Sequence, residues 1–417
     1  MSFYMEGNYA PVHSEVTEFD LKITGQVPPE LNGTYLRNGP NPRQESAHWF
    51  TGEGMIHGVR LEGSRARWYR NRWVRTHSTK VYAPDGSRDL TAGTANTHVV
   101  HHAGRTFALV ESSLPVEITT ELDTIGPYDF GGRLTDSMTA HPKICPETGE
   151  LHFFSYGSVR PPYVTYHRAD AEGNLLLSQP IDVGGHTMMH DFQLTAKHIV
   201  FMDLPVVFDH DRPGMPYRWS DTYPARLGVL RRDDPHGTVQ WFSINPCYVF
   251  HGLNAHDTDG GIVIEVVRYP HLWRDGDTQP FPDSTLWRWS LDLAGGTVKE
   301  EQLDDRVCEF PRVDDAHAGQ NVQFGHVVTD HELVRYDLWH NATTVHDFGA
   351  ARRPAEASLV PGRDTDWLLT YVYDAATDGS TLEILDAGDL NAAPHATIQL
   401  PQRVPYGFHG NWIPAED

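Results

Sequence analysis

Cysteine is scarce in this chain of 417 residues. The three cysteines, Cys145, Cys247 and Cys308, are too few and too scattered to form a disulfide framework or a cage of thiolate ligands around a metal ion. This scarcity favours a reducing compartment, and the cytoplasm is the simplest one.

Basic residues and long apolar runs are also in short supply. Lys and Arg together number 33 against 56 Asp and Glu, a formal net charge of −23, so the surface repels phosphate backbones and argues against a nucleic-acid partner. No stretch reaches the roughly 18 apolar residues of a membrane span; the best run, 198–208, is interrupted by Asp203 and Pro205. The first residues lack the basic start and apolar core of a signal peptide. We therefore expect no stable membrane anchor.

Helical periodicity with proper caps is hard to find. Instead, 36 Gly and 29 Pro separate short segments rich in β-branched and aromatic residues, such as 105–111, 261–267 and 367–373. No Gly/Ser linker or block of charge divides the chain. The sequence predicts an all-β protein, with a lead-in over residues 1–24 and a single domain over residues 25–417.

Histidine, by contrast, is abundant, with 25 copies. Most are expected to be solvated or held in ordinary hydrogen bonds. Four lie in settings rich in glycine, proline or aromatic residues: His141 (TAHP), His190 (MHDF), His251 (FHGLN) and His409 (GFHG). Imidazole is a good ligand for divalent iron, copper, nickel and zinc. We predict that these four converge on one metal ion.

The spacing of these histidines favours a β-propeller. They are separated by 49, 61 and 158 residues, and a propeller blade takes about 40 to 50 residues, more with loop insertions. Steps of about one, one and three blades would bring each histidine to the central channel. A β-sandwich offers no equally simple way to gather them, but exact repeats are absent, so spacing alone leaves it open.

Four neutral ligands need partners for their outward-facing ring nitrogens, and carboxylates serve this purpose in many metal sites. Candidates on or near predicted strands are Glu111, Glu309 and Glu356. From spacing alone, each also fits an ordinary surface or salt-bridged glutamate.

Several blocks of the sequence resemble the carotenoid cleavage oxygenases, a family that includes apocarotenoid oxygenases, lignostilbene-type stilbene oxygenases and a retinoid isomerase. Residues 30–42 (ELNGTYLRNGPNP) look like the N-terminal signature of that family. Residues 50–58 (FTGEGMIHG) are similar to its next block, with Glu53 where Asp is more usual. The resemblance runs from Gly25 to Trp412, nearly the whole chain.

The resemblance implies a seven-bladed β-propeller with one ferrous ion on its central axis and loops forming a cap over it. The family's ligand motifs match His141, His190, His251 and His409. Its outer carboxylates match Glu111, Glu309 and Glu356, which should hydrogen-bond three of the four ligands. Thr97 matches a threonine that lines an open iron position in some members. The remaining histidines considered are expected to be structural: His57, His101, His102, His256 and His317.

The implied chemistry is oxidative scission of one C=C bond by dioxygen, giving two carbonyl products. Val110 stands where stilbene-cleaving members usually carry a lysine that grips a ring hydroxyl. The segment Thr76–Asn96 is short and polar, where members that take carotenoids from membranes carry an apolar insertion. We therefore expect a small hydrophobic conjugated alkene of the apocarotenoid type, with stilbenes or phenylpropenoids as the alternative substrates.

Three other interpretations remain open at this point. Isomerisation without oxygen occurs in the retinoid isomerase branch. A zinc hydrolase would need three ligands and a carboxylate base near the open position, which four histidines with distal glutamates fit poorly. A non-catalytic metal-binding propeller would be favoured by loss of a ligand, yet all four histidines are present. The sequence allows a monomer or a dimer.

Overall fold

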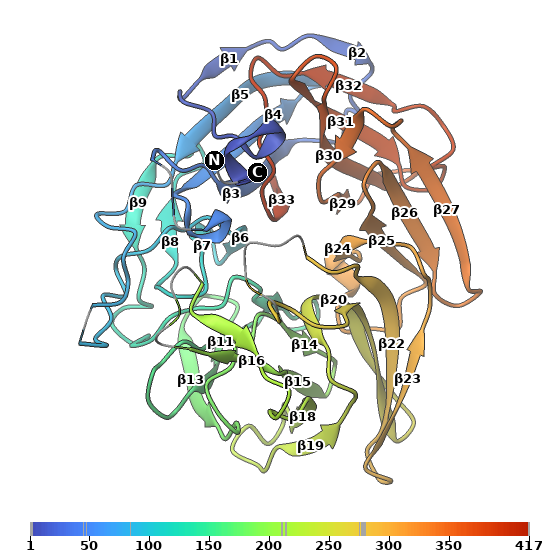
Figure 1. Ribbon diagram of the computed structural model, residues 1–417. Helices are drawn as coiled ribbons and strands as arrows, with labels where there is room; N and C mark the ends of the chain where they lie inside the picture. The colour runs from blue at the N-terminus through green and yellow to red at the C-terminus, as the bar shows by residue number, and fades with distance from the viewer. Residues whose placement is uncertain are drawn as a thin grey trace.

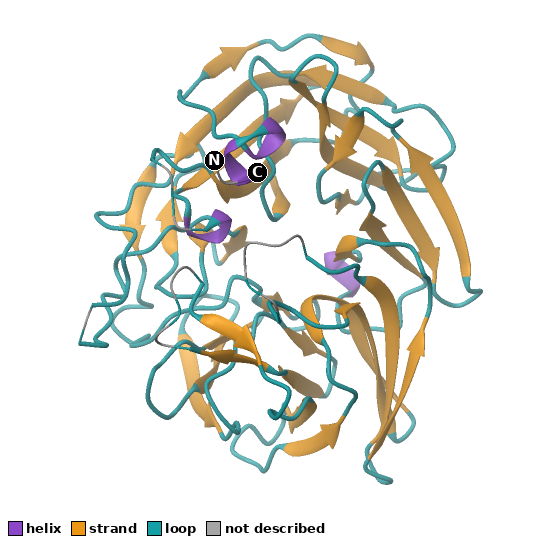
Figure 2. Cartoon of the chain, in the orientation of Figure 1, coloured by secondary structure: helices purple, strands orange, loops and turns teal. Residues whose placement is uncertain are grey.

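The computed structural model describes residues 3–44, 46, 48–83, 85–209, 212, 215–274, 276 and 281–415. Strands dominate it, and the helical segments among these residues are four short 3-10 turns: η1 (Phe3–Met5), η2 (Gly7–Tyr9), η3 (Trp49–Thr51) and η4 (Asp315–His317). Figure 2 shows how little of the chain is helical. The all-β prediction is confirmed. No helix in the described ranges is long and apolar enough to cross a membrane.

Seven antiparallel sheets are arranged in a ring around a central axis (Figure 1), as predicted for a seven-bladed propeller. We number these blades along the chain and give the strands of each in sheet order. Blade 1 consists of β33 (Gly410–Pro414), β3 (Gly33–Pro40), β4 (Gly54–Glu62), β5 (Arg65–Trp73) and β1 (Thr17–Phe19). Blade 2 consists of β6 (His98–His102), β7 (Arg105–Leu109), β8 (Val116–Ile118) and β9 (Thr124–Pro127). Blade 3 consists of β10 (Lys143–Ile144), β11 (Leu151–Ser155), β12 (Val164–Ala169) and β13 (Leu175–Ile181).

The next two blades follow the same plan, with one insertion. Blade 4 consists of β14 (Phe192–Leu194), β15 (His198–Asp203), β18 (Arg226–Arg231) and β19 (Gln240–Ser243). Between β15 and β18 the chain forms a separate two-stranded ribbon, β16 (Val206–Phe208) and β17 (Tyr217–Trp219). Blade 5 consists of β20 (Tyr248–Thr258), β21 (Gly261–Tyr269), β22 (Thr285–Asp292) and β23 (Thr297–Gln302).

The last two blades complete the ring. Blade 6 consists of β24 (Glu309–Arg312), β25 (Phe324–Val328), β26 (Glu332–Asp337) and β27 (Ala342–Asp347). Blade 7 consists of β28 (Arg352–Pro354), β30 (Trp367–Asp374), β31 (Gly379–Asp386), β32 (Ala396–Gln399) and β2 (Ile23–Gly25), with β29 (Ser358–Val360) also paired to β30.

Strands from both ends of the chain close the ring. β33 pairs with β3, with Leu36 opposite Asn411, while β1 and β2 add outer strands to blades 1 and 7. The lead-in predicted for residues 1–24 therefore contains all of β1 and the first two residues of β2. The pairing of β33 with β3 joins the two ends of the chain within blade 1.

Burial follows position in the blade. All five side chains of β11 (LHFFS) are buried, because this strand packs against blades on both faces. The outer strand β13 alternates between covered and exposed residues, as expected where one face meets solvent. The cores between blades are thus built from the short apolar segments visible in the sequence. The three cysteines are buried and unpaired.

Candidate metal centre and cavity

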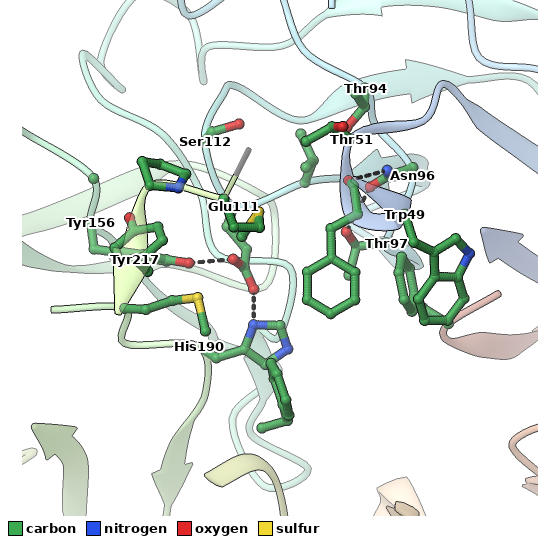
Figure 3. Close-up of a pocket in the computed structure, with 18 of the residues that line it drawn as sticks. Trp49, Thr51, Thr94, Asn96, Thr97, Glu111, Ser112, Tyr156, His190 and Tyr217 are labelled. Carbon is green, nitrogen blue, oxygen red and sulfur yellow. Dashed lines mark hydrogen bonds and ion pairs between the residues drawn. The ribbon is translucent and has the colours of Figure 1, made fainter. Parts of the chain in front are cut away.

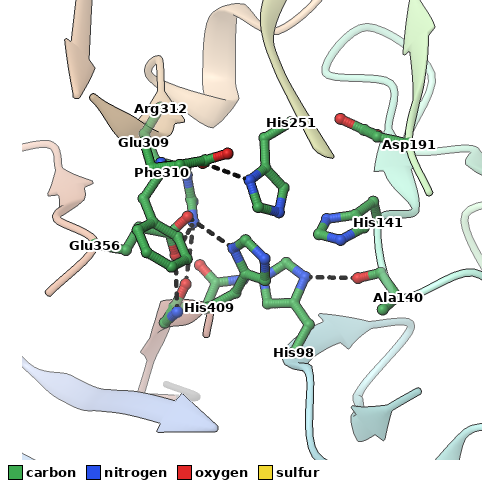
Figure 4. Close-up of polar contacts among 12 residues, drawn as sticks. His98, Ala140, His141, Asp191, His251, Glu309, Phe310, Arg312, Glu356 and His409 are labelled. Atoms are coloured by element: carbon green, nitrogen blue, oxygen red, sulfur yellow. Dashed lines mark hydrogen bonds and ion pairs between the residues drawn. The ribbon is translucent and has the colours of Figure 1, made fainter. Parts of the chain in front are cut away.

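The four predicted histidines come together at the inner strands of four blades (Figure 4 shows three of them). His141 lies two positions before β10, and His190 lies two positions before β14. His251 lies within β20, and His409 directly precedes β33. The ring centroids of neighbouring members are close: 4.5 Å for His141 and His190, 4.6 Å for His141 and His409, 4.6 Å for His251 and His409, and 5.2 Å for His190 and His251.

The three glutamates hold three of these rings through Nδ1. His251 Nδ1 lies 2.7 Å from a Glu309 carboxylate oxygen, and His409 Nδ1 lies 2.9 Å from Glu356. His190 Nδ1 is paired with Glu111 (Figure 3). Among the described residues, no carboxylate pairs with His141. The structure thus places each predicted glutamate against one predicted histidine and leaves the fourth histidine to other partners.

These carboxylates fix the tautomer of the three rings that they contact. A neutral imidazole has one N–H, so donation from Nδ1 leaves Nε2 with a free lone pair. His251 Nε2 is buried without a hydrogen-bond partner, an unfavourable state unless a cation accepts the lone pair. His141 Nε2 and His190 Nε2 are 3.0 Å apart, and two nitrogens about 2.1 Å from one ion and at right angles would be separated by about this distance. The donor set therefore fits a metal ion.

The buried charges around the cluster also fit a divalent cation. Glu111, Glu309, Glu356 and Asp191 supply four carboxylates near the rings, while Lys143 pairs with Asp191 at 2.8 Å and Arg312 with Glu356 at 3.3 Å. Among the described residues, Glu111 and Glu309 pair with no lysine or arginine, and uncompensated charge is costly inside a protein. An ion of charge 2+ would neutralise this surplus.

The pKa values of the ligand histidines shift in different directions. Burial, and then the neighbouring histidines, hold the pKa of His141 and of His409 well below the usual range, so both rings are neutral. Burial also acts to lower the pKa of His251, but the Glu309 carboxylate outweighs it and raises that pKa. Although burial opposes it, the pKa of Glu309 is lowered by His251, the Phe310 N–H and the Tyr269 hydroxyl. These shifts keep Glu309 ionised against its ligand.

Local backbone irregularities aim the side chains. The β20–β21 register shifts on both sides of Gly252, and such bulges redirect neighbouring side chains. A Cβ on Gly252 would lie 1.8 Å from Gln193 Nε2, so a larger residue beside His251 would have to displace the Gln193 amide. Phe310 adopts a φ of 53°, a sparsely populated conformation for a bulky residue, and its N–H donates to the Glu309 carboxylate at 2.5 Å.

Sequence reasoning missed two polar residues at the cluster. Asp191 accepts a hydrogen bond from the Gly252 N–H at 3.0 Å and pairs with Lys143, so it joins the segments that carry His141, His190 and His251. His98 places Nδ1 2.9 Å from the Ala140 carbonyl oxygen, next to His141. Asp191 stands beside a predicted ligand in the sequence, but nothing there reveals that it reaches two other blades.

A cavity of about 560 Å³ ends at the cluster. Its lining includes His190, His251 and His409, together with Thr97 and Val110. The aromatic residues that line it include Trp49, Phe50, Phe250, Phe281, Phe310 and Phe408. The Thr97 hydroxyl donates to Asn96 Oδ1 at 3.0 Å, so its hydrogen is already committed to a protein partner. Pockets of this size and apolar character are typical of small-molecule sites.

A second cavity of about 410 Å³ also reaches the cluster. It shares His251 and His409 with the first, but its lining carries charged residues, namely Lys143, Asp191, Arg312, Asp315 and Glu356. The histidine cluster therefore lies between an aromatic cavity and a charged one.

Histidines expected to be structural have ordinary partners. His57 Nδ1 is 2.9 Å from the Tyr69 hydroxyl, His101 Nδ1 is 3.0 Å from Thr106 Oγ1, and His102 Nε2 is 3.0 Å from the Gly149 carbonyl oxygen. On η4, His317 pairs with Asp314 at 2.8 Å. His256 is half-buried, and no group of potential metal-ligating residues among the described ranges includes it.

Comparison with known proteins agrees with this architecture. The RPE65 family (retinal pigment epithelial membrane protein) matches residues 9–414. A carotenoid cleavage oxygenase from Mycobacterium tuberculosis is 38% identical over 99% of this chain and 97% of its own. The chain belongs to the carotenoid cleavage oxygenase family. The family resemblance predicted from the sequence is thereby confirmed.

Two solved members of this family share the propeller. The Pseudomonas brassicacearum lignostilbene dioxygenase superimposes with a TM-score of 0.88 and 27% identity, covering 99% of this chain and 98% of its own. A cobalt-substituted form of Synechocystis ACO, an apocarotenoid oxygenase, gives a TM-score of 0.86 and 25% identity, with 97% of both chains covered. That relative contains cobalt, which is consistent with a metal site at the histidine cluster of this chain.

Proposed function

We propose that this protein is a non-haem iron dioxygenase that cleaves one C=C bond of a conjugated alkene into two carbonyl products. One ferrous ion per chain would be held by His141, His190, His251 and His409, with dioxygen as the co-substrate. The observation that carries the proposal is four imidazoles, three of them held by carboxylates, at the end of an aromatic cavity. Membership of the carotenoid cleavage oxygenase family supports it.

The bound ion would supply the activation of dioxygen next to the alkene. The chain itself supplies orientation and a dry site. Glu111, Glu309 and Glu356 hold the ligand rings, and the aromatic residues of the cavity pack along a conjugated chain and exclude water from it. No side chain is required as a general acid or base. Thr97 lines the cavity near the cluster and would limit access to one open coordination position.

An apocarotenoid-type alkene is the substrate class that we favour. Val110 lines the cavity beside Glu111, so an apolar side chain occupies the position of the lysine expected in stilbene-cleaving relatives. The relative from M. tuberculosis is named for carotenoid cleavage, and a structural neighbour is an apocarotenoid oxygenase. Stilbenes or phenylpropenoids are the alternative, supported by the lignostilbene dioxygenase. We place the protein in the cytoplasm, since its cysteines are unpaired.

Product analysis with isotopically labelled dioxygen tests this function. Iron-loaded protein, incubated with a panel of apocarotenals and stilbenes, should give two carbonyl fragments that together account for the carbon skeleton, with label in at least one. Incubation without oxygen should give none. An oxygen-independent product of unchanged mass would instead indicate isomerisation. Metal binding without any conversion across the panel would favour the non-catalytic propeller.

A further inference from the structure

The walls of the aromatic cavity differ in character. One side is an apolar cluster in which the centroids of Phe50 and Phe408 are 5.4 Å apart and those of Phe250 and Phe281 are 5.7 Å apart. Five tyrosines also line the cavity: Tyr9, Tyr82, Tyr156, Tyr217 and Tyr269. The labelled side chains of Tyr156 and Tyr217 lie together beside Glu111 in Figure 3, on the opposite side from Trp49. Tyr156 and Tyr217 thus place two phenol groups beside Glu111, whereas Tyr269 packs on Phe250 at a centroid distance of 5.5 Å.

Three of these hydroxyls are committed to protein partners, including that of Tyr269, which donates to the Glu309 carboxylate at 2.8 Å. Tyr82 donates to the Gly157 carbonyl oxygen at 2.9 Å, and Tyr156 donates to the Glu111 carboxylate. Among the described residues, no hydrogen bond to the Tyr217 hydroxyl is found, and the residue is 7% exposed and lines the cavity. This hydroxyl is not one of the unpaired side-chain atoms that are sealed from solvent, so it is open to the cavity and can donate a hydrogen bond to a ligand there.

Tyr217 is held firmly relative to the histidine cluster. It pairs with Phe208 in the β16–β17 ribbon. The ribbon is in turn bonded to the segment leading to His190, because the Met188 N–H donates to Val206 at 2.8 Å and the Phe208 N–H to His186 at 2.9 Å. The hydroxyl thus has a fixed position with respect to the proposed reaction centre.

The surroundings of Tyr217 select the charge of its partner. Burial, and then Tyr82 and Glu111, raise the pKa of Tyr217 well above its usual value, so the phenol remains a neutral donor. The Glu111 carboxylate lines the cavity and disfavours an anion beside Tyr217, while the Lys80 ammonium group lines the same cavity. A phenol that donates a hydrogen bond fits a neutral oxygen that accepts one, such as a carbonyl or hydroxyl.

We infer that Tyr217 binds a neutral carbonyl or hydroxyl oxygen of the substrate, which makes oxygenated conjugated alkenes preferred over hydrocarbon polyenes of equal length. This inference rests on the proposed function for the identity of the alkene. Tyr217 would then be a residue that determines substrate specificity, and it lies on the β16–β17 ribbon, outside the sequence motifs of the four histidines.

The test compares Tyr217→Phe with the parent protein, using a polyene aldehyde and the hydrocarbon polyene of the same length as probes. Tyr128→Phe, in blade 2 and outside both cavities, is the matched control. Affinity is measured by quenching of tryptophan fluorescence, and cleavage by product formation. We expect Tyr217→Phe to weaken aldehyde binding and kcat/KM about tenfold, the value of one hydrogen bond, with less than about a twofold change for the hydrocarbon.

Binding and cleavage are measured separately, so the role of Tyr217 and the proposed cleavage function can be judged independently. Equal effects on both probes, no effect on either, or failure of the parent protein to bind the aldehyde would overturn the role of Tyr217. Selective loss of aldehyde binding would support it even if the parent protein cleaved neither probe, in which case the proposed cleavage function alone would fail.

Discussion

At the scale of single residues, the site depends on carboxylates that the metal would not touch. Glu309 binds both the His251 ring and the Tyr269 hydroxyl, the latter at 2.8 Å. Glu111 similarly binds His190 and Tyr156. Each carboxylate therefore connects a ligand to a tyrosine in the cavity wall, and its two oxygens are fixed from both sides. Such partners orient the ligands and raise their basicity.

Replacing Glu309 with glutamine should weaken metal binding while preserving shape. Glu309→Gln retains a hydrogen-bonding group beside His251 but removes the charge, and we expect the Kd for cobalt to rise about 10- to 100-fold. Anaerobic cobalt titration, followed by visible absorption, measures the effect. Glu301→Gln on the exposed strand β23 is the control. A Kd within about twofold of the parent value would argue that Glu309 only stabilises the fold.

The histidines of the site could be predicted at this scale, because each lies in a recognisable sequence motif. His141, His190, His251 and His409 were predicted as a group, and the structure brings them together. Asp191 was not predicted, because its role depends on contacts with Gly252 and Lys143 from other blades. Tyr217 was not predicted either, since an unpaired hydroxyl can be recognised only when every potential partner has been located.

At the scale of elements, the inner strands act as a frame for the ligands. Asp191 receives the Phe192 N–H at 2.8 Å and the Gly252 N–H at 3.0 Å. Together with Lys143, it ties the starts of β10 and β14 to the bulge in β20. A shift in any of these strands would therefore move more than one ligand.

A double-mutant cycle tests this frame. Asp191→Asn leaves Lys143 as an unpaired cation close to the metal site, so we expect cobalt affinity to fall about tenfold. Lys143→Met on that background removes the unpaired charge and should restore part of the affinity. Cobalt titration of the parent, both single variants and the double variant gives the coupling energy. Additive effects of the two substitutions would contradict coupling through this pair.

Strand prediction succeeded where the apolar pattern is strong and failed where it is absent. The predicted segments 261–267 and 367–373 lie within β21 (Gly261–Tyr269) and β30 (Trp367–Asp374). The short strands β1 and β2 bury little side-chain surface, so they leave no periodic signal. The bulge at Gly252 and the positive φ of Phe310 arise from tertiary packing, which local propensity does not encode.

At the scale of the whole molecule, ring closure and the metal site share one strand. β33 closes the ring by pairing with β3, and His409 directly precedes it. Arg312 adds to this link, because it donates to the Gly410 carbonyl oxygen at 3.0 Å and pairs with Glu356. Metal binding and closure of the propeller should therefore be thermodynamically linked, since a ligand stabilises the state that binds it.

The fold should lose stability in mild acid through buried neutral histidines. Burial is the main cause that lowers the pKa of His57, His152 and His326 to about 3, whereas an unfolded histidine has a pKa of about 6.5. As the pH falls through about 6.5 toward about 3, the unfolded chain takes up protons that the folded chain does not, so the free energy of unfolding decreases. Each such residue contributes about 1.4 kcal/mol per pH unit within that window.

Urea unfolding at about pH 7 and about pH 5 measures this loss. His57→Gln removes one of the three groups and can still bond to Tyr69, so the decrease in stability between the two pH values should be smaller in the variant. An unchanged decrease would show that His57 does not contribute to the acid sensitivity.

The central claim is that four histidines hold one iron. Elemental analysis of protein purified without oxygen tests it most directly, with His190→Ala as the variant and His317→Ala, on the exposed turn η4, as the control. We predict about one iron per chain in the parent and the control, and loss of iron in His190→Ala. Stoichiometric zinc, no metal after reconstitution with ferrous ion, or full iron retention in His190→Ala would contradict the account.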